Sequence, residues 1–162
     1  NITVVYETEV NAFAPMDAAG NITNTAVVTG AGITPITVTE TIGTESTPIL
    51  TITKSVSPVP VTENGTLTYT FLIQNSGSAP ADIGTDAVIV DTFNPLLSNL
   101  AVSFNGTAWA ETTNYTYDET TGVFTTIAGQ ITVPAATYTQ NPVTGVWTAD
   151  PGVSTLVVKG TI

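Results

Sequence analysis

The chain has 162 residues, enough for one good hydrophobic core, and its 13 acidic residues against two lysines, with no arginine or histidine, give a net charge of −11. That charge argues against nucleic acid or an anionic membrane surface as a partner, because both would repel the protein. No apolar run approaches the ~18 residues needed to cross a bilayer, so we expect no membrane insertion.

The composition is typical of β-structure. Threonine supplies about a fifth of the residues, and valine and isoleucine are abundant. Cysteine is absent, so the sequence predicts no disulfide framework, and a chain without cysteine suits an extracellular protein that must not misoxidise.

Alternation of apolar and polar residues predicts strands over most of the chain, and no helix-period segment competes with them. Asn64-Gly65, Asn105-Gly106 and the loop 117–122 are turn signals between them. Short strands separated by turns predict an all-β protein with an immunoglobulin-like antiparallel β-sandwich. The predicted strands are 2–10, 21–29, 33–41, 49–56, 65–75, 86–92, 99–109, 112–117, 122–132 and 153–162.

A polar break ending in proline divides the chain at residues 44–48. We therefore predict three parts: N-terminal strands over 1–43, a linker over 44–48 and a β-sandwich domain over 49–162. The front part holds three strands at most, and such a unit is rarely stable without a partner.

The strand 49–56 raises a specific question. Leu50, Ile52, Lys54 and Val56 share one parity, so a half-buried strand would point the Lys54 ammonium toward the core. An isolated buried ammonium is costly, and Lys54 therefore needs a partner.

Four stretches of the back part follow one another in a recognisable order: "LTITKSVSP" (50–58), "GTLTYTFLIQNSGSAPA" (65–81), "AVIVDTFNP" (87–95) and "PGVSTLVVKGTI" (151–162). They resemble the lysine strand, the tyrosine strand ending in Asn-x-Gly, the strand ending in Asp before a turn proline and the late Pro-Gly strand of a bacterial surface repeat. That repeat is the family called domain of unknown function eleven. Some clostridial spore-appendage proteins look like they carry such repeats, and the resemblance implies a secreted protein on a bacterial cell or spore surface.

The front part resembles the final strands of the same repeat, which ordinarily follow the Pro-Gly strand. In this chain "NITVVYETEVNAF" and "GNITNTAVVTG" (20–30) come first, so the order looks circularly permuted. Either these strands fold back onto their own sandwich or they complete the sandwich of a neighbouring subunit. Return along an eight-residue strand needs about 27 Å, whereas the linker 44–48 reaches at most ~17 Å, and this favours the neighbour.

The leading functional hypothesis is a structural subunit of an extracellular filament, a pilus-like fibre or spore appendage. Its partner would be itself, in a head-to-tail homopolymer formed by donor-strand complementation. The alternative is an adhesive or ligand-binding repeat module of a larger surface protein. In that case the aromatic residues Trp109, Tyr138 and Trp147 would stack on a sugar face. The other interpretation of these residues is that they lie in a core or anchor a loop.

We do not expect an enzyme, because histidine, cysteine, phosphate loops and zinc spacings are all missing. Asp118 and Glu119 are adjacent carboxylates, but neighbouring positions of a hairpin point to opposite faces. Asp82, Asp86 and Asp118 offer loop oxygens for calcium without any fixed-spacing motif. The sequence thus predicts no cofactor and no metal.

Two further polar residues occupy core-facing positions like that of Lys54. Asn75 continues the parity of Leu67 to Ile73, and Asp91 continues that of Ala87 and Ile89, although Val88 and Val90 could equally be the inward set. Lys54, Asn75 and Asp91 resemble the Lys, Asn and acid triad of intramolecular isopeptide bonds in Gram-positive adhesins and pilins. The other interpretation is a buried Lys54–Asp91 ion pair, with Asn75 capping a turn.

Overall fold

The computed structural model describes residues 3–8, 10, 21–43, 46–144 and 146–162. The chain divides into two compact units, one made of Asn1–Ser46 and Tyr138–Ala149 and the other of Thr47–Thr137 and Asp150–Ile162. The boundary near Ser46 falls within the predicted linker 44–48, of which residues 44 and 45 lie outside the described part.

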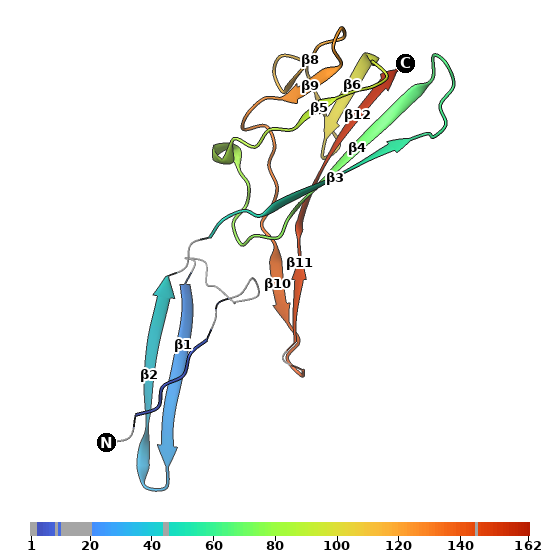
Figure 1. The fold of residues 1–162 in the computed structure, drawn as a ribbon. Coiled ribbons are helices and arrows are strands. Elements are labelled where there is room, and N and C mark those ends of the chain that lie inside the picture. Colours follow the sequence, from blue (N-terminus) through green and yellow to red (C-terminus); the bar gives the residue numbers. More distant parts are fainter. Residues whose placement is uncertain (1–2, 9, 11–20, 44–45, 145) are drawn as a thin grey trace. The chain divides into compact units, whose positions relative to one another are not determined.

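The second unit is an antiparallel β-sandwich, as the sequence predicted (Figure 1). Its larger sheet has five strands in the order β3-β4-β12-β6-β7, every neighbouring pair antiparallel. The strands are β3 (Leu50–Ser57), β4 (Thr66–Asn75), β12 (Gly152–Thr161), β6 (Ser98–Phe104) and β7 (Thr107–Trp109).

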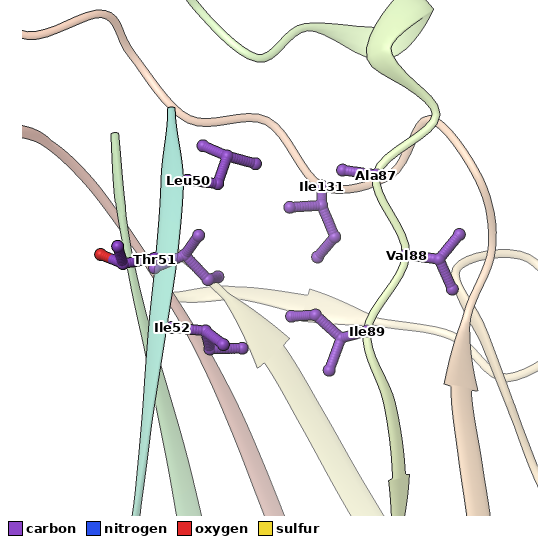
Figure 2. Close-up of a pocket in the computed structure, with 8 residues that line it drawn as sticks. Leu50, Thr51, Ile52, Ala87, Val88, Ile89 and Ile131 are labelled. Carbon is purple, nitrogen blue, oxygen red and sulfur yellow. The ribbon is translucent and has the colours of Figure 1, made fainter. Parts of the chain in front are cut away.

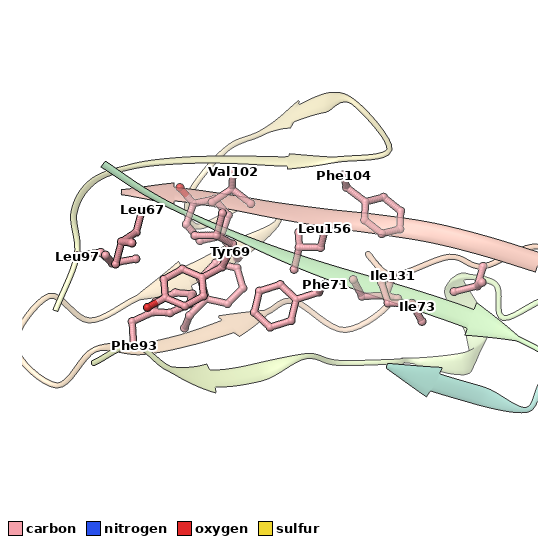
Figure 3. Packing of buried hydrophobic residues seen from close by; sticks show 14 of the residues in the cluster. Leu67, Tyr69, Phe71, Ile73, Phe93, Leu97, Val102, Phe104, Ile131 and Leu156 are labelled. Atoms are coloured by element: carbon pink, nitrogen blue, oxygen red, sulfur yellow. The ribbon is translucent and has the colours of Figure 1, made fainter. Parts of the chain in front are cut away.

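The opposite layer is a smaller antiparallel sheet of three strands in the order β5-β9-β8. These are β5 (Val90–Thr92), β9 (Val123–Thr126) and β8 (Tyr115–Tyr117), and a short 3-10 helix, η1 (Ile83–Thr85), precedes β5. Strict alternation in β4 and β12 places every second side chain in the core between the layers, as expected for strands with one buried face (Figure 3). Among the core residues are Leu67, Tyr69, Phe71, Ile73, Phe93, Leu97, Val102, Phe104, Phe124, Ile131, Leu156 and Val158.

Two further hairpins complete the described elements. The first pairs β1 (Asn21–Gly30) with β2 (Ile33–Gly43) in an antiparallel register that joins Ile22 to Ile42 and Val28 to Ile36. The second pairs β10 (Thr137–Gln140) with β11 (Trp147–Asp150). No helix among the described residues is long and apolar enough to cross a membrane.

The turn predictions are confirmed where the structure describes them. Asn105 and Gly106 both have positive φ, 49° and 81°, which is the backbone of a tight hairpin turn, and they divide the predicted strand 99–109 into β6 and β7. The loop between β8 and β9 lies where the segment 117–122 predicted it.

The prediction of a strand over 2–10 is wrong for its described residues, Thr3–Thr8 and Val10, which belong to no strand. Alternation indicates a strand-like side-chain pattern, but a strand also needs a partner for its backbone groups, and the sequence cannot reveal whether one is present.

Some other strands were predicted too long, and two strands were not predicted. The strand over 86–92 is reduced to Val90–Thr92, because the Ile89 N–H donates to the Thr126 hydroxyl at 2.9 Å instead of to a backbone carbonyl. β8 and β9 are shorter than 112–117 and 122–132. The segment 133–151, for which no strand was predicted, contains β10 and β11.

Candidate functional site

The inward face of the edge strand β3 is apolar and uncovered. Leu50, Ile52 and Val56 pair with the buried residues Asn75, Ile73 and Tyr69 of β4, so their side chains point to the core side of the sheet. They nevertheless keep 37%, 50% and 38% of their surface exposed. Inward apolar side chains of a sandwich are normally buried, and this exposure marks a gap in the opposite layer.

The gap is an apolar groove between β3 and the segment that leads into β5. Figure 2 shows Leu50 and Ile52 pointing across it toward Ile131 and Ile89, whereas Val88 points away. We call this the β3–β5 groove; it is lined by Leu50, Thr51, Ile52, Ile73, Ala87, Val88, Ile89 and Ile131.

One rim of the groove is a free strand edge. β5 bonds to β9 through its odd-numbered residues: the Ile89 carbonyl accepts from Thr126 N–H at 3.0 Å, and the Phe93 N–H donates to Gly122 at 2.8 Å. In an antiparallel ladder the alternate residues direct their backbone groups to the other side. Val88, Val90 and Thr92 therefore present backbone donors and acceptors at an edge that pairs with no other described strand.

Lys54 lies in the same inward row and forms an ion pair with Asp91 of β5. The pair crosses between the two layers, and both side chains remain partly exposed. The Oδ2 atom of Asp91 is buried, and Lys54 is its only partner within the described part of the chain. This confirms the inward orientation of Asp91, and Val90 is correspondingly exposed.

Three aromatic rings surround the Lys54 ammonium. Its Nζ atom lies 4.7 Å from the centroid of the Tyr69 ring, 5.4 Å from Phe93 and 5.6 Å from Phe71, within the range of cation–π attraction. Burial raises the pKa of the Tyr69 hydroxyl, and the Asp91 carboxylate and Tyr117 raise it further. The lysine is thus accommodated by one carboxylate and by the faces of core rings.

Asn75 is fully buried, and its amide closes the end of the sandwich. Its Oδ1 accepts from the N–H groups of Ile49 and Gly77, each at 2.9 Å, and its Nδ2 donates to the carbonyls of Ala79 at 2.7 Å and Pro134 at 3.0 Å. Four hydrogen bonds exhaust the capacity of a side-chain amide. Asn75 therefore joins three chain segments and does more than cap a turn.

The structure brings Lys54 and Asp91 together but leaves Asn75 apart from them. Lys54 is paired with Phe71, four residues along β4 from Asn75, a separation of about 13 Å along the strand. The ammonium lies over Tyr69, on the side away from Asn75. This geometry favours the ion pair over the isopeptide bond.

The loop carboxylates are engaged in turns. Asp118 Oδ1 accepts from the Thr120 hydroxyl at 2.6 Å and from the Thr120 N–H at 2.8 Å, and these bonds lower the pKa of Asp118 to about 2. Asp82 caps η1 by accepting from Gly84 N–H at 2.9 Å. Among the described residues no group of three acidic side chains is arranged to hold a metal ion.

Of the aromatic residues considered for sugar stacking, Trp109 packs against the core. Its ring stacks on Phe104 at a centroid distance of 4.9 Å and is only partly exposed. The side chain of Trp147 lies outside the described residues.

The front part of the chain exposes a second apolar surface. In the β1–β2 hairpin, Val28, Ile36, Val38 and Ile42 share one face and are all exposed. The segment Thr3–Thr8 is linked to this hairpin by a hydrogen bond from the Asn24 amide to the Tyr6 hydroxyl, and its Val4, Val5 and Tyr6 are exposed.

The sequence alone did not identify the groove. Parity placed Leu50 and Ile52 on the inward face of their strand, but it gave no information on the layer opposite. Finding the groove would require knowing how many strands lie on each side of the core. Sequence patterns do not assign strands to sheets, so they do not give this number.

Comparison with known proteins gave no match to the chain among protein-family models, curated proteins or solved structures.

The Lys54–Asp91 geometry predicts that no covalent crosslink forms. The intact mass of the denatured chain should equal the mass calculated from the sequence. A mass lower by one ammonia, and restored in Lys54→Ala after correction for the substitution, would instead establish the isopeptide bond.

The ion pair should couple the two layers energetically. We expect a double-mutant cycle of Lys54→Met and Asp91→Asn, followed by urea unfolding, to give a coupling free energy of about 1 kcal/mol, because Lys54 alone neutralises the buried Oδ2 of Asp91. The matched control is Lys159→Met, the same change at the other, exposed lysine, which should shift stability by less than about 0.5 kcal/mol. Additive effects of the two changes would show that the pair contributes nothing.

Proposed function

We propose that this protein is a structural subunit that polymerises head to tail, the front segment of one copy completing the sandwich of the next. The observation that carries the proposal is the uncovered inward face of β3, where Leu50 and Ile52 line an open apolar groove beside the free edge of β5. A sandwich lacking a strand exposes both apolar side chains and unpaired backbone groups, and an added strand satisfies both.

The front part has the complementary properties. A two-stranded hairpin is marginally stable on its own, and this one exposes an apolar face that includes Val28, Ile36 and Val38. Of the segment before it, the described residues 3–8 and 10 are also exposed and belong to no strand, so they are available to join a sheet.

The front part is the donor surface and the β3–β5 groove is the acceptor surface. They are different surfaces of one chain, so the contact that they make between copies is heterologous. A heterologous contact that does not close into a ring continues indefinitely and gives a filament. The net charge of −11 keeps neighbouring filaments apart by repulsion that salt screens. The resemblance to bacterial surface repeats supports the proposal that such a filament lies outside the cell, on a bacterial cell or spore, with a structural and non-catalytic role.

Assembly is testable with the purified chain. We expect filaments by electron microscopy and large particles by light scattering, and we expect both to disappear in Val4→Glu, because a carboxylate on the donor would enter an apolar groove. Val143→Glu is the matched control, since Val4 and Val143 are both exposed valines, at 82% and 91%, and neither change should unfold the chain.

Deletion of residues 1–43 should likewise leave a chain that forms no filaments and is poorly soluble, because its groove has no donor. A full-length chain that stays a monodisperse monomer at high concentration would contradict the proposal, and so would a truncated chain that polymerises like the intact one.

A further inference from the structure

We propose that residues 3–10 of one copy add as a strand to the free edge of β5 in a second copy and cover the β3–β5 groove. This inference rests on the proposed function and specifies its two contact surfaces. Both proposed contact surfaces expose apolar side chains to solvent: Ile52 in the groove and Val4 in the segment 3–10.

The groove requires a β-strand as its occupant. Its lining is aliphatic apart from Thr51, and Leu50, Ile52 and Ile89 offer an occupant only apolar side chains. Its rim, however, carries the outward backbone groups of Val88 and Val90, which need hydrogen-bond partners once they are covered. A small apolar ligand would satisfy the lining alone, whereas a strand with an apolar face satisfies lining and rim together.

Residues 3–10, "TVVYETEV", have the required pattern. Their even positions are Val4, Tyr6, Thr8 and Val10, and their odd positions include Glu7 and Glu9. In a strand these sets point to opposite faces, so an apolar face would meet the groove while the glutamates face solvent. The described residues of this stretch are in no strand, which leaves their backbone available.

The lengths also agree. Residues 3–10 supply four side chains on one face, and β3 presents four inward positions, Leu50, Ile52, Lys54 and Val56. A strand beside β5 would therefore lie above the whole uncovered row, including the aliphatic stem of Lys54, while Asp91 remains the partner of the ammonium.

A second copy is the source of the strand, because the linker 44–48 reaches at most ~17 Å, whereas return along an eight-residue strand needs about 27 Å. Val4, Val5 and Tyr6 are all exposed and offer an apolar surface to another copy. Each added copy brings a new open groove with it, and growth therefore continues.

Cysteine crosslinking tests the pairing directly, since the described chain contains no cysteine of its own. Side chains directly opposite on neighbouring strands have Cβ atoms about 4.5–5.5 Å apart, close enough for a disulfide after small adjustments. We would combine Ile89→Cys with Val4→Cys, Tyr6→Cys, Thr8→Cys or Val10→Cys in turn, which tests every position of the face that would meet the groove. Tyr6→Cys with Val153→Cys is the control, because Val153 lies on the opposite face of the larger sheet.

After mild oxidation and denaturation, we expect at least one of the Ile89→Cys combinations to give a ladder of covalent multimers and the Val153→Cys control to give none. Crosslinked monomers alone would mean that the strand fills its own groove, and this would overturn the proposal. Filaments without any crosslink at Ile89 would overturn the acceptor site while leaving the proposed function intact. A chain that never assembles would overturn both.

A substitution in the groove provides an independent readout. Ile52→Glu should weaken assembly more than about tenfold, because the carboxylate must be buried when the strand adds. Val153→Glu, on the same sheet with 46% exposure against 50% for Ile52, should assemble like the unmodified chain. Both variants should unfold at nearly the same denaturant concentration as the unmodified chain. Equal assembly of the two variants would contradict the groove as acceptor.

Discussion

The smaller sheet of the sandwich has three strands and the larger sheet has five, so the smaller sheet cannot cover the whole of the larger one. The groove and the free strand edge follow from this difference in strand number. The ion pair from β3 to β5 and the contact of the Tyr69 and Phe93 rings, whose centroids are 4.7 Å apart, place the β5 end of the small sheet against the β3 and β4 end of the large sheet. Beyond β5 the opposite layer ends, and the inward row of β3 is left open. The apolar groove and the free strand edge both lie where the smaller sheet ends at β5.

Lys54 illustrates how the chain tolerates that opening. At a fully covered position an ammonium would require complete desolvation, but at the margin of the small sheet it keeps contact with water while reaching Asp91. The three surrounding rings add attraction without needing a second buried charge. A charge at an open edge also discourages unspecific pairing of sheets, a role that lysines often have on edge strands.

At the other end of the same row, Asn75 holds the sandwich together without any charge. Two of its four hydrogen bonds join the end of β4 to Ile49 before β3 and to Pro134 before β10. Gly152 lies directly against this junction, where a Cβ atom would come within 1.8 Å of the Pro134 carbonyl oxygen. The Pro-Gly pair that begins β12 thus has a steric reason, because only glycine allows the two backbones to approach so closely.

Local periodicity predicted much of the fold. The parity of β3 and β4 placed Leu50, Lys54 and Asn75 on the inward face, and the turn at Asn105-Gly106 was confirmed because its glycine and asparagine adopt positive φ. Of the candidate site, the partnership of Lys54 with Asp91 was within reach of the sequence, since a lysine on an apolar face demands an acid.

The sequence could not show which strands lie beside or opposite one another in the fold. Residues 3–8 alternate like a strand, yet pairing depends on a partner edge that no local pattern encodes. The β10–β11 hairpin was missed because prolines interrupt the alternation between residues 133 and 151. The β3–β5 groove was missed for the same physical reason, because it depends on where the opposite layer ends.

The central claim is that the free edge of β5 becomes a paired edge on assembly. Amide hydrogen exchange of Val88, Val90 and Thr92 measures this most directly, because their N–H groups point away from β9. In the Val4→Glu chain, which we expect not to assemble, these amides should exchange rapidly. In filaments of the unmodified chain they should become as protected as the amide of Asp91 in the β5–β9 ladder. Exchange at these three residues that stays equally fast in filaments would contradict the account.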